Sequence, residues 1–423
     1  MQISFFYKNF LLKKYKIIFL SLILILVFYR SPYIFLNGRF VAEEGSFWFN
    51  NTFSFGIFHG LTQLYAGSGY FNLWANLSSV FASFTSLNYS PLVTVYFAAI
   101  VQIYLLIFIV FSNSYFLKNN IDKTIISLVV LVGPPMVAEV WLNTLTSQSY
   151  FTIITILIFF QKDISSNIFN KLSPLILVIS GLTSLLSCAL SPFFLYKYLN
   201  DKSKFNFNNF IAIICTSIFQ SLIFAYSKIQ NLDLTGENTR FLVSFDKVVN
   251  LIYNIIIKSF FGRDLTHFLY NNILVSLNIF LVIILIVTFF LFIIKLLFNL
   301  FKKDKLFLSL SIFFIIILFI TFFGAKAEQV QGRYALIPGI LLIFITYRVS
   351  QISNGILKFL SSLLIVICLF SGFYEYKSKN IYPQFLICMN CPNWKNEVST
   401  WSEDNSYLLK IWQYPTKKMS LKK

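Results

Sequence analysis

Charged residues are scarce in this chain of 423 residues: Asp, Glu, Lys and Arg make up 12% of it, whereas 57% of the residues are hydrophobic. Such a composition excludes a soluble enzyme, a nucleic-acid-binding domain and a disordered chain. Residues 45–117 contain no Asp, Glu, Lys or Arg, and further uncharged runs cover residues 140–161, 172–196, 205–227, 265–294 and 306–325. A bilayer core needs about 20 apolar residues per helix, so the sequence predicts a membrane protein with several spanning helices.

Other absences exclude further classes of membrane protein. The two histidines, His59 and His267, have no metal-ligand spacing, and none of the spans holds a histidine of the kind that a membrane-bound acyltransferase needs. No Gly-rich phosphate loop lies between a strand and a helix, so a nucleotide-sugar site is not expected. The uncharged runs are continuously apolar and do not alternate, which favours helices over an outer-membrane barrel.

Lysines mark the predicted cytoplasmic side. Several of them precede the first apolar run at residues 17–36, so the positive-inside rule places the N-terminus in the cytoplasm. Lysine-bearing loops further along the chain are the other predicted cytoplasmic loops. Threading the chain between these loops leaves four of the 16 acidic residues inside and twelve outside. The polar chemistry is therefore expected on the outer face.

The predicted fold is all-α: a polytopic transmembrane bundle of about nine to eleven helices, with an external juxtamembrane helical region. Residues 1–373 form the predicted transmembrane domain, and residues 374–423 a small external tail in which Cys388 and Cys391 could form a disulfide. Residues 69–111 must cross the membrane once, and residues 172–196 form a short hairpin or a re-entrant pair. We expect a multi-pass protein of the plasma (inner) membrane whose active face is periplasmic or external.

Two adjacent carboxylates, Glu43 and Glu44, follow the first predicted helix on its outer side. Carboxylates near the hydrocarbon are costly, so they persist where they have a partner or a task; two solvated interface residues are the alternative. Neighbouring residues on a helix point about 100° apart, so the two carboxylates are not expected to share one role. One of them could act as a general base while the other holds the loop or a metal ion.

This acidic pair, placed in the first external loop and followed by an amphipathic aromatic stretch at residues 46–70, resembles the glycosyltransferase C superfamily. That superfamily includes the protein O-mannosyltransferases and the bacterial lipid-A aminoarabinose transferases, which use polyprenyl-phosphate sugar donors. The resemblance implies that Glu43 or Glu44 is the catalytic base or a ligand of a divalent metal ion, and it implies no other cofactor. The usual Asp-Glu or Glu-Asp pair is replaced here by Glu-Glu, which leaves open which residue has the role.

Gly332, Arg333 and Tyr334, with Pro338, open a late helix on its outer side, and similar Arg-Tyr segments occur in many such transferases. The guanidinium of Arg333 could hold a phosphate by two parallel hydrogen bonds, or it could simply reach towards lipid headgroups. The amides near residue 143 could bind sugar hydroxyls or cap the helices there. The complete set of substrate-binding candidates is Arg333, Tyr334, Gln331, Lys326, Arg240, Asn143, Gln148 and His59.

The resemblance thus implies an inverting membrane glycosyltransferase that moves a sugar from a lipid phosphate to an acceptor hydroxyl on the outer face. Its expected partners are the lipid-linked donor, membrane lipid and a glycan, lipid or protein acceptor, and no nucleic acid. A polysaccharide polymerase or ligase is the first alternative, but such enzymes tend to carry their arginines in a large late loop. A transporter of lipid-linked glycans is the second alternative, and it would call for charges within the spans or inverted repeats.

Overall fold

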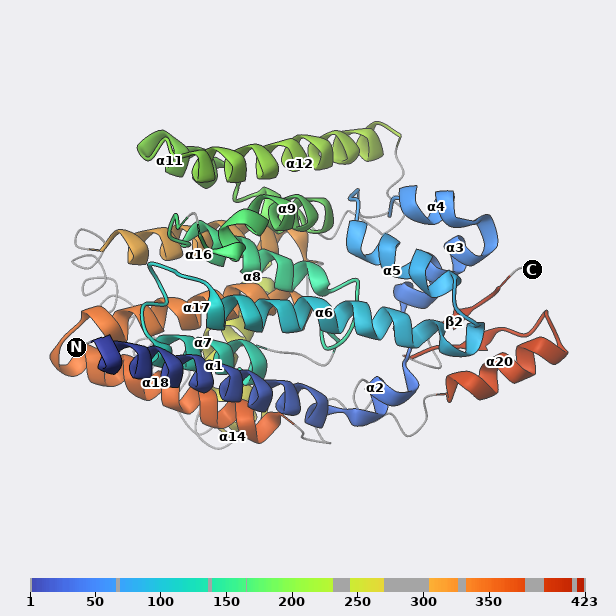
Figure 1. Ribbon diagram of the computed structural model, residues 1–423. Helices are drawn as coiled ribbons and strands as arrows, with labels where there is room; N and C mark the ends of the chain where they lie inside the picture. Colours follow the sequence, from blue (N-terminus) through green and yellow to red (C-terminus); the bar gives the residue numbers. More distant parts are fainter. Residues whose placement is uncertain are drawn as a thin grey trace. The chain divides into compact units, whose positions relative to one another are not determined.

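The computed structural model describes residues 2–65, 69–135, 139–164, 166–230, 244–269, 304–325, 332–376, 392–412 and 417–421. These residues form helices, one two-stranded antiparallel sheet and three isolated bridges (Figure 1). Five of the described helices are long and apolar enough to cross a membrane. The helical fold class is therefore confirmed, and the apolar helices indicate a multi-pass membrane protein.

The chain divides into two compact units. The first consists of Met1–Ser127, Ala138–Gly236 and Tyr382–Lys423, and the second of Leu128–Val137 and Glu237–Ile381. The predicted C-terminal tail thus belongs with the first unit from Tyr382 onward. The predicted domain boundary between residues 373 and 374 stays a prediction.

The first unit contains, in chain order, α1 (Gln2–Arg30), α2 (Pro32–Asn37), a π-helical segment (Glu44–Phe49), α3 (Asn50–Phe55), α4 (Ile57–Thr62), α5 (Leu73–Ser83), a 3-10 turn (Leu87–Tyr89), α6 (Ser90–Phe111), the start of α7 (Asn120–Val132), α8 (Ser147–Phe159), α9 (Ile168–Thr183), α10 (Leu185–Cys188), α11 (Ser191–Asn200), α12 (Lys204–Ile229), α20 (Trp394–Glu403), β1 (Leu409–Lys410) and β2 (Lys418–Met419). The second unit contains the end of α7, α13 (Phe245–Leu251), a π-helical segment (Ile252–Ile257), α14 (Lys258–Leu269), α16 (Lys305–Gly324), α17 (Arg333–Ile352) and α18 (Gly355–Glu375).

Residues 69–111 hold one short helix and one long one. The 11 residues of α5 span only about 16 Å, too little for a hydrocarbon core of about 30 Å. The following segment, Leu87–Phe111, is long and apolar enough to cross. This agrees with the predicted single crossing of that stretch.

Residues 172–196 lie in α9, the short α10 and α11, and all three helices pack against α12 (Figure 1). The hairpin or re-entrant pair expected for this stretch stays a prediction. A Cβ atom on Gly181 of α9 would come within 2.7 Å of the Cβ of Thr216 on α12. Only glycine permits this close approach of the two helices. The side chain of Gln220 strengthens the contact by donating a 3.1 Å hydrogen bond to the Gly181 carbonyl.

Two lysines, Lys123 and Lys197, cap the C-termini of two helices in the first unit. Lys123 Nζ donates to the carbonyls of Val110 and Ser112 at the end of α6, at 3.0 and 2.7 Å. Lys197 Nζ donates to the carbonyl of Phe159 at the end of α8, at 2.6 Å. The last carbonyls of a helix lack partners within the helix, and a cation there also interacts favourably with the helix dipole. The sequence predicts both lysines in cytoplasmic loops, whereas the structure places Lys123 near the start of α7 and Lys197 in the last turn of α11.

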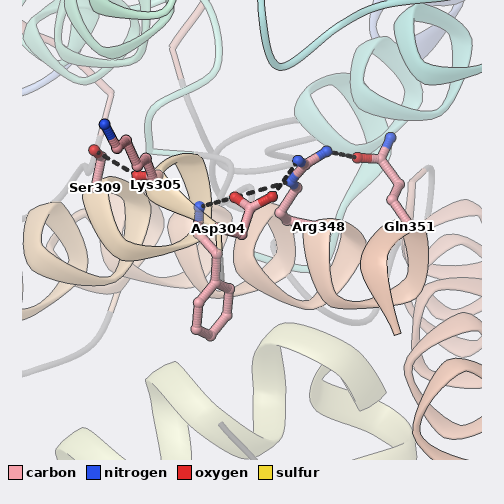
Figure 2. A network of polar contacts seen from close by, with 6 residues as sticks. Asp304, Lys305, Ser309, Arg348 and Gln351 are labelled. Carbon is pink, nitrogen blue, oxygen red and sulfur yellow. Dashed lines mark hydrogen bonds and ion pairs between the residues drawn. The ribbon is translucent and has the colours of Figure 1, made fainter. Parts of the chain in front are cut away.

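In the second unit, an ion pair joins the start of α16 to the end of α17 (Figure 2). Asp304 accepts a 2.7 Å hydrogen bond from Phe307 N, which makes it the N-cap of α16. The same carboxylate lies 2.5 Å from Arg348 Nη2, and Arg348 Nη1 donates to the side-chain oxygen of Gln351 at 2.9 Å. The two helices are therefore antiparallel and fixed at one shared end.

Candidate functional site

The acidic pair is positioned by a tight approach of two helices in the first unit. Helix α1 ends at Arg30, and Pro32 starts α2 at a position where its missing N–H costs nothing. Gly38 ends α2 with φ at +71°, and a Cβ atom there would lie 2.7 Å from Leu92 N at the start of α6. The chain then turns at Ala42, whose φ is +48°, and enters the π-helical segment at Glu44.

Glu44 is buried, with 1% of its surface exposed, and both of its carboxylate oxygens are occupied. Oε1 accepts hydrogen bonds from Thr144 N at 3.0 Å and from Thr144 Oγ1 at 2.5 Å. Oε2 accepts a bond from Val41 N at 3.3 Å. Glu44 therefore ties the segment after α2 to the loop between α7 and α8, which is the loop-holding role that the sequence offered for one member of the pair.

Opposing effects act on the ionisation of Glu44. Burial raises the pKa of its carboxyl group, and this effect exceeds the lowering by the hydrogen bonds from Thr144 and Val41 and by the charge of Arg39. The carboxyl group therefore takes up a proton more readily than an exposed glutamate.

Glu43 has a different environment. Its side chain is 30% exposed, and its Oε1 lies 2.9 Å from Nζ of Lys417 in the C-terminal tail. Glu43 is therefore the member of the pair that solvent can reach. The structure separates the two adjacent carboxylates as expected, with one buried in a hydrogen-bonded contact and one at the surface.

The C-terminal tail packs directly on this segment. Trp412 N donates to Phe40 O at 3.0 Å, and the backbones of Val41 and Trp412 form a parallel bridge. Trp394 Nε1 donates to Leu87 O at 2.7 Å. The buried apolar cluster that joins the tail to the segments around it comprises Phe40, Phe49, Ala82, Trp394, Val398, Trp401, Leu409, Ile411, Met419 and Leu421. The described part of the tail is thus docked on the segment that carries the acidic pair.

Two arginines that the sequence analysis did not select lie beside the acidic pair. Arg39 is 1% exposed, its Nη2 donates to Trp141 O at 2.7 Å, and its Cζ lies 4.6 Å from the centroid of the Trp412 ring. The Cζ of Arg30 lies 4.5 Å from the centroid of the Trp141 ring. A signal was present in the sequence, because these are the only arginines before residue 240 and they flank α2.

The charge of Arg39 is affected by its surroundings. Burial lowers the pKa of Arg39 to about 9; the carboxylate of Glu44 opposes this shift, and the positive charge of Arg30 adds to it. The guanidinium remains a cation at neutral pH. Two guanidinium groups, those of Arg30 and Arg39, and the partly exposed carboxylate of Glu43 thus lie within one short segment of the chain, residues 30–43.

Of the two predicted sugar-binding amides, that of Asn143 is used within its own loop. Asn143 is buried, its Nδ2 donates to Glu139 O at 3.2 Å, and its Oδ1 accepts from Leu145 N at 3.0 Å. Gln148 is partly buried in the first turn of α8. Asn143 therefore stabilises a turn within this loop and does not have the helix-capping role that the sequence offered as the alternative to sugar binding.

The remaining candidates lie elsewhere. His59 is exposed on α4, with its ring centroid 5.1 Å from that of Phe55, as in an aromatic interface segment. Arg333 and Tyr334 open α17 in the second unit, and Arg333 Cζ lies 5.3 Å from the centroid of the Tyr334 ring. The expected pairing of Arg333 with the acidic pair stays a prediction. Three candidates and both tail cysteines lie outside the described residues: Arg240, Lys326, Gln331, Cys388 and Cys391.

Within the described ranges, no group of three His, Cys, Asp or Glu side chains is arranged to hold a metal ion. A comparison of the chain with protein-family models, with curated proteins and with solved structures found no match.

Proposed function

We propose that this protein is an inverting membrane glycosyltransferase that moves a sugar from a polyprenyl-phosphate donor to an acceptor hydroxyl on the outer face of the plasma (inner) membrane. In this proposal the N-terminus is cytoplasmic, and the π-helical segment, α3, α4 and the C-terminal tail lie outside. The chain is a polytopic bundle in which both units contribute spans.

The observation that carries the proposal is the divided environment of the acidic pair. Glu44 is held by Thr144 and Val41, while Glu43 stays half-exposed next to it. A general base needs a carboxylate that the substrate can reach, on a support that does not move. Glu43 meets the first condition, and the hydrogen bonds of Glu44 provide the second. We therefore assign the base to Glu43 and the positioning role to Glu44.

The distribution of lysines supports the proposed orientation. Lys123 and Lys197 cap the ends of α6 and α8 beside the loops that we assign to the cytoplasm. The acidic pair follows the C-terminal end of α1, which we assign to the outer side. Positive charge on cytoplasmic loops is the usual determinant of orientation.

In the proposed reaction, Glu43 accepts the proton of the acceptor hydroxyl while the oxygen of that hydroxyl attacks the anomeric carbon. The new bond joins that carbon to the acceptor oxygen, and the bond from the carbon to the phosphate oxygen breaks. The electron pair leaves with the lipid phosphate, and the anomeric configuration inverts. Holding donor and acceptor together supplies much of the rate enhancement. Arg333 stays the predicted guanidinium that receives the leaving phosphate.

Substitution of the acidic pair tests this proposal in cells that depend on the introduced copy. Glu43→Gln should insert normally and abolish the addition of one sugar residue to an envelope lipid, glycan or protein, measured by mass spectrometry. Glu403→Gln is the matched control, because Glu403 is an exposed glutamate of the C-terminal tail. Full activity of Glu43→Gln would exclude the assigned base. A product lengthened by many repeat units would instead indicate a polymerase.

The orientation is tested separately. Lys417→Cys, in a chain whose five native cysteines are replaced by Ser, should react with a membrane-impermeant maleimide in intact spheroplasts. Lys417 lies at the acidic pair and is partly exposed, so the reagent can reach it. Labelling only after the membrane is permeabilised would place the acidic pair in the cytoplasm and overturn the proposed function.

A further inference from the structure

Arg39 has hydrogen-bond donors without acceptors. Its Nη2 bonds to Trp141 O, whereas its Nε and Nη1 are buried and have no hydrogen-bond partner. These two nitrogens carry three of the five N–H donors of a guanidinium. Leaving such donors dry and unpaired costs free energy, and a charged group costs more than a neutral one. An acceptor that comes from outside the chain, such as a bound ion, is one explanation for donors of this kind in a native protein.

The nearby carboxylate does not supply that acceptor. The hydrogen bonds of Glu44 come from Thr144 and Val41, and Glu44 acts on Arg39 only through its charge. Arg30 adds a second positive charge that acts on Arg39. The groups around Arg39 therefore favour an added anion, and a small oxyanion has several acceptor oxygens for the unused donors.

Aromatic rings hold the guanidinium in place. Trp412 stacks on Arg39, and Trp141 supplies the carbonyl for Nη2 while its ring lies under Arg30. A guanidinium fixed between such groups loses little freedom when it binds a phosphate. Arg39 is 1% exposed, so an anion reaches it only when a covering side chain moves. Trp412, on the C-terminal tail, is such a cover.

We propose that Arg39 binds the phosphate group of the lipid-linked donor, with Arg30 adding positive charge, after the tail segment that carries Trp412 moves off the guanidinium. This inference rests on the proposed glycosyl transfer and names a phosphate-binding residue in the same unit as the acidic pair. The residue that binds the leaving phosphate, Arg39, would then lie four positions before the assigned base Glu43 in the sequence.

The test measures binding directly, apart from sugar transfer. The purified full chain in detergent is titrated with a short-chain isoprenyl monophosphate and with inorganic phosphate. It is also compared in nanodiscs with and without phosphatidylglycerol, which distinguishes a lipid headgroup from the donor phosphate. Wild type should bind the isoprenyl phosphate and unfold at a higher temperature in its presence. Arg39→Gln should bind at least about tenfold more weakly, since hydrogen bonds to charged groups contribute about that much or more.

Two further variants keep the result interpretable. Arg39→Lys retains the charge without the planar fork, so it should fold like wild type and bind with intermediate affinity. Arg333→Gln removes the guanidinium that the sequence predicts for the leaving phosphate, and it should bind the isoprenyl phosphate more tightly than Arg39→Gln does; the reverse order would overturn the inference. Wild-type affinity in both Arg39 variants overturns the inference, as does a preference for phosphatidylglycerol over the isoprenyl phosphate. Either result leaves the proposed transfer standing, because the Glu43→Gln assay decides that separately.

Discussion

The carboxylate of Glu44 accepts hydrogen bonds from both the backbone N–H and the hydroxyl of Thr144, a residue 100 positions further along the chain. This contact joins the segment after α2 to the loop before α8. Since Glu43 directly precedes Glu44 in the chain, the same contact fixes where the assigned base lies. The stability of this one junction should therefore affect both folding and activity.

Thr144→Val removes the hydroxyl at nearly constant volume and leaves the backbone N–H bond in place. The buried carboxylate of Glu44 then loses one of its three hydrogen bonds. We expect the free energy of unfolding to fall by about 1–3 kcal/mol, the usual cost for a hydrogen bond to a charged group. Thermal unfolding of the purified protein measures the change.

Thr62→Val is the matched control for this substitution. The Thr62 hydroxyl donates to Phe58 O within α4 and is exposed to solvent. Its loss should change the unfolding temperature far less. Equal effects of the two substitutions would show that the contact between Glu44 and Thr144 is not a stabilising junction.

The raised pKa of Glu44 predicts a specific pH dependence. Burial is the largest cause of the shift, so the folded protein binds this proton more tightly than the unfolded chain does. The corresponding stabilisation is fully present below the unfolded-state pKa and is lost as the pH rises through the folded-state pKa. Glu44→Gln removes the titrating group. The unfolding temperature of wild type minus that of Glu44→Gln should therefore fall as the pH is raised from about 4 to about 7.

A difference that stays constant or grows over this range would contradict the assignment. Glu403→Gln, measured in parallel, controls for pH effects on the rest of the molecule, because Glu403 is exposed.

Much of the fold could be predicted because hydropathy is a local property of the chain. The uncharged runs located α6, α12 and the helices α9 to α11. The acidic pair was found for the same reason, since two carboxylates are conspicuous beside a run of 73 uncharged residues.

The roles within the site could not be predicted, because they depend on partners far away in the sequence. Thr144 occupies Glu44 and Lys417 pairs with Glu43, across 100 and 374 residues respectively. No periodicity in the sequence reports such contacts. Arg39 was missed because an arginine next to a predicted membrane span is usually an interfacial anchor, and only its burial distinguishes it.

The docking of the tail on the first unit depends on a few buried side chains. Leu409 in β1 is 0% exposed and lies in the apolar cluster with Phe40, whereas its neighbour Leu408 is 46% exposed. Leu409→Ala should destabilise the docked tail by about 2–5 kcal/mol, and Leu408→Ala should have little effect. Hydrogen exchange of residues 40–49 and 394–412 measures docking. Similar exchange in the two variants would mean that this cluster does not hold the tail.

The ion pair between Asp304 and Arg348 should couple the facing ends of α16 and α17 (Figure 2). The side chains of the two residues are 16% and 9% exposed, so removal of either partner leaves a poorly hydrated charge. Asp304→Asn and Arg348→Met should each destabilise the second unit, and the double variant should be less destabilised than the sum of the single ones. We expect this double-mutant cycle to give a coupling free energy of about 0.5–3 kcal/mol. Thermal unfolding of the four proteins measures it. Since Asp304 also caps α16 through Phe307 N, Asp304→Asn retains a side-chain acceptor and isolates the loss of charge. Purely additive effects would mean that the capping bond, and not the ion pair, stabilises this end of the helices.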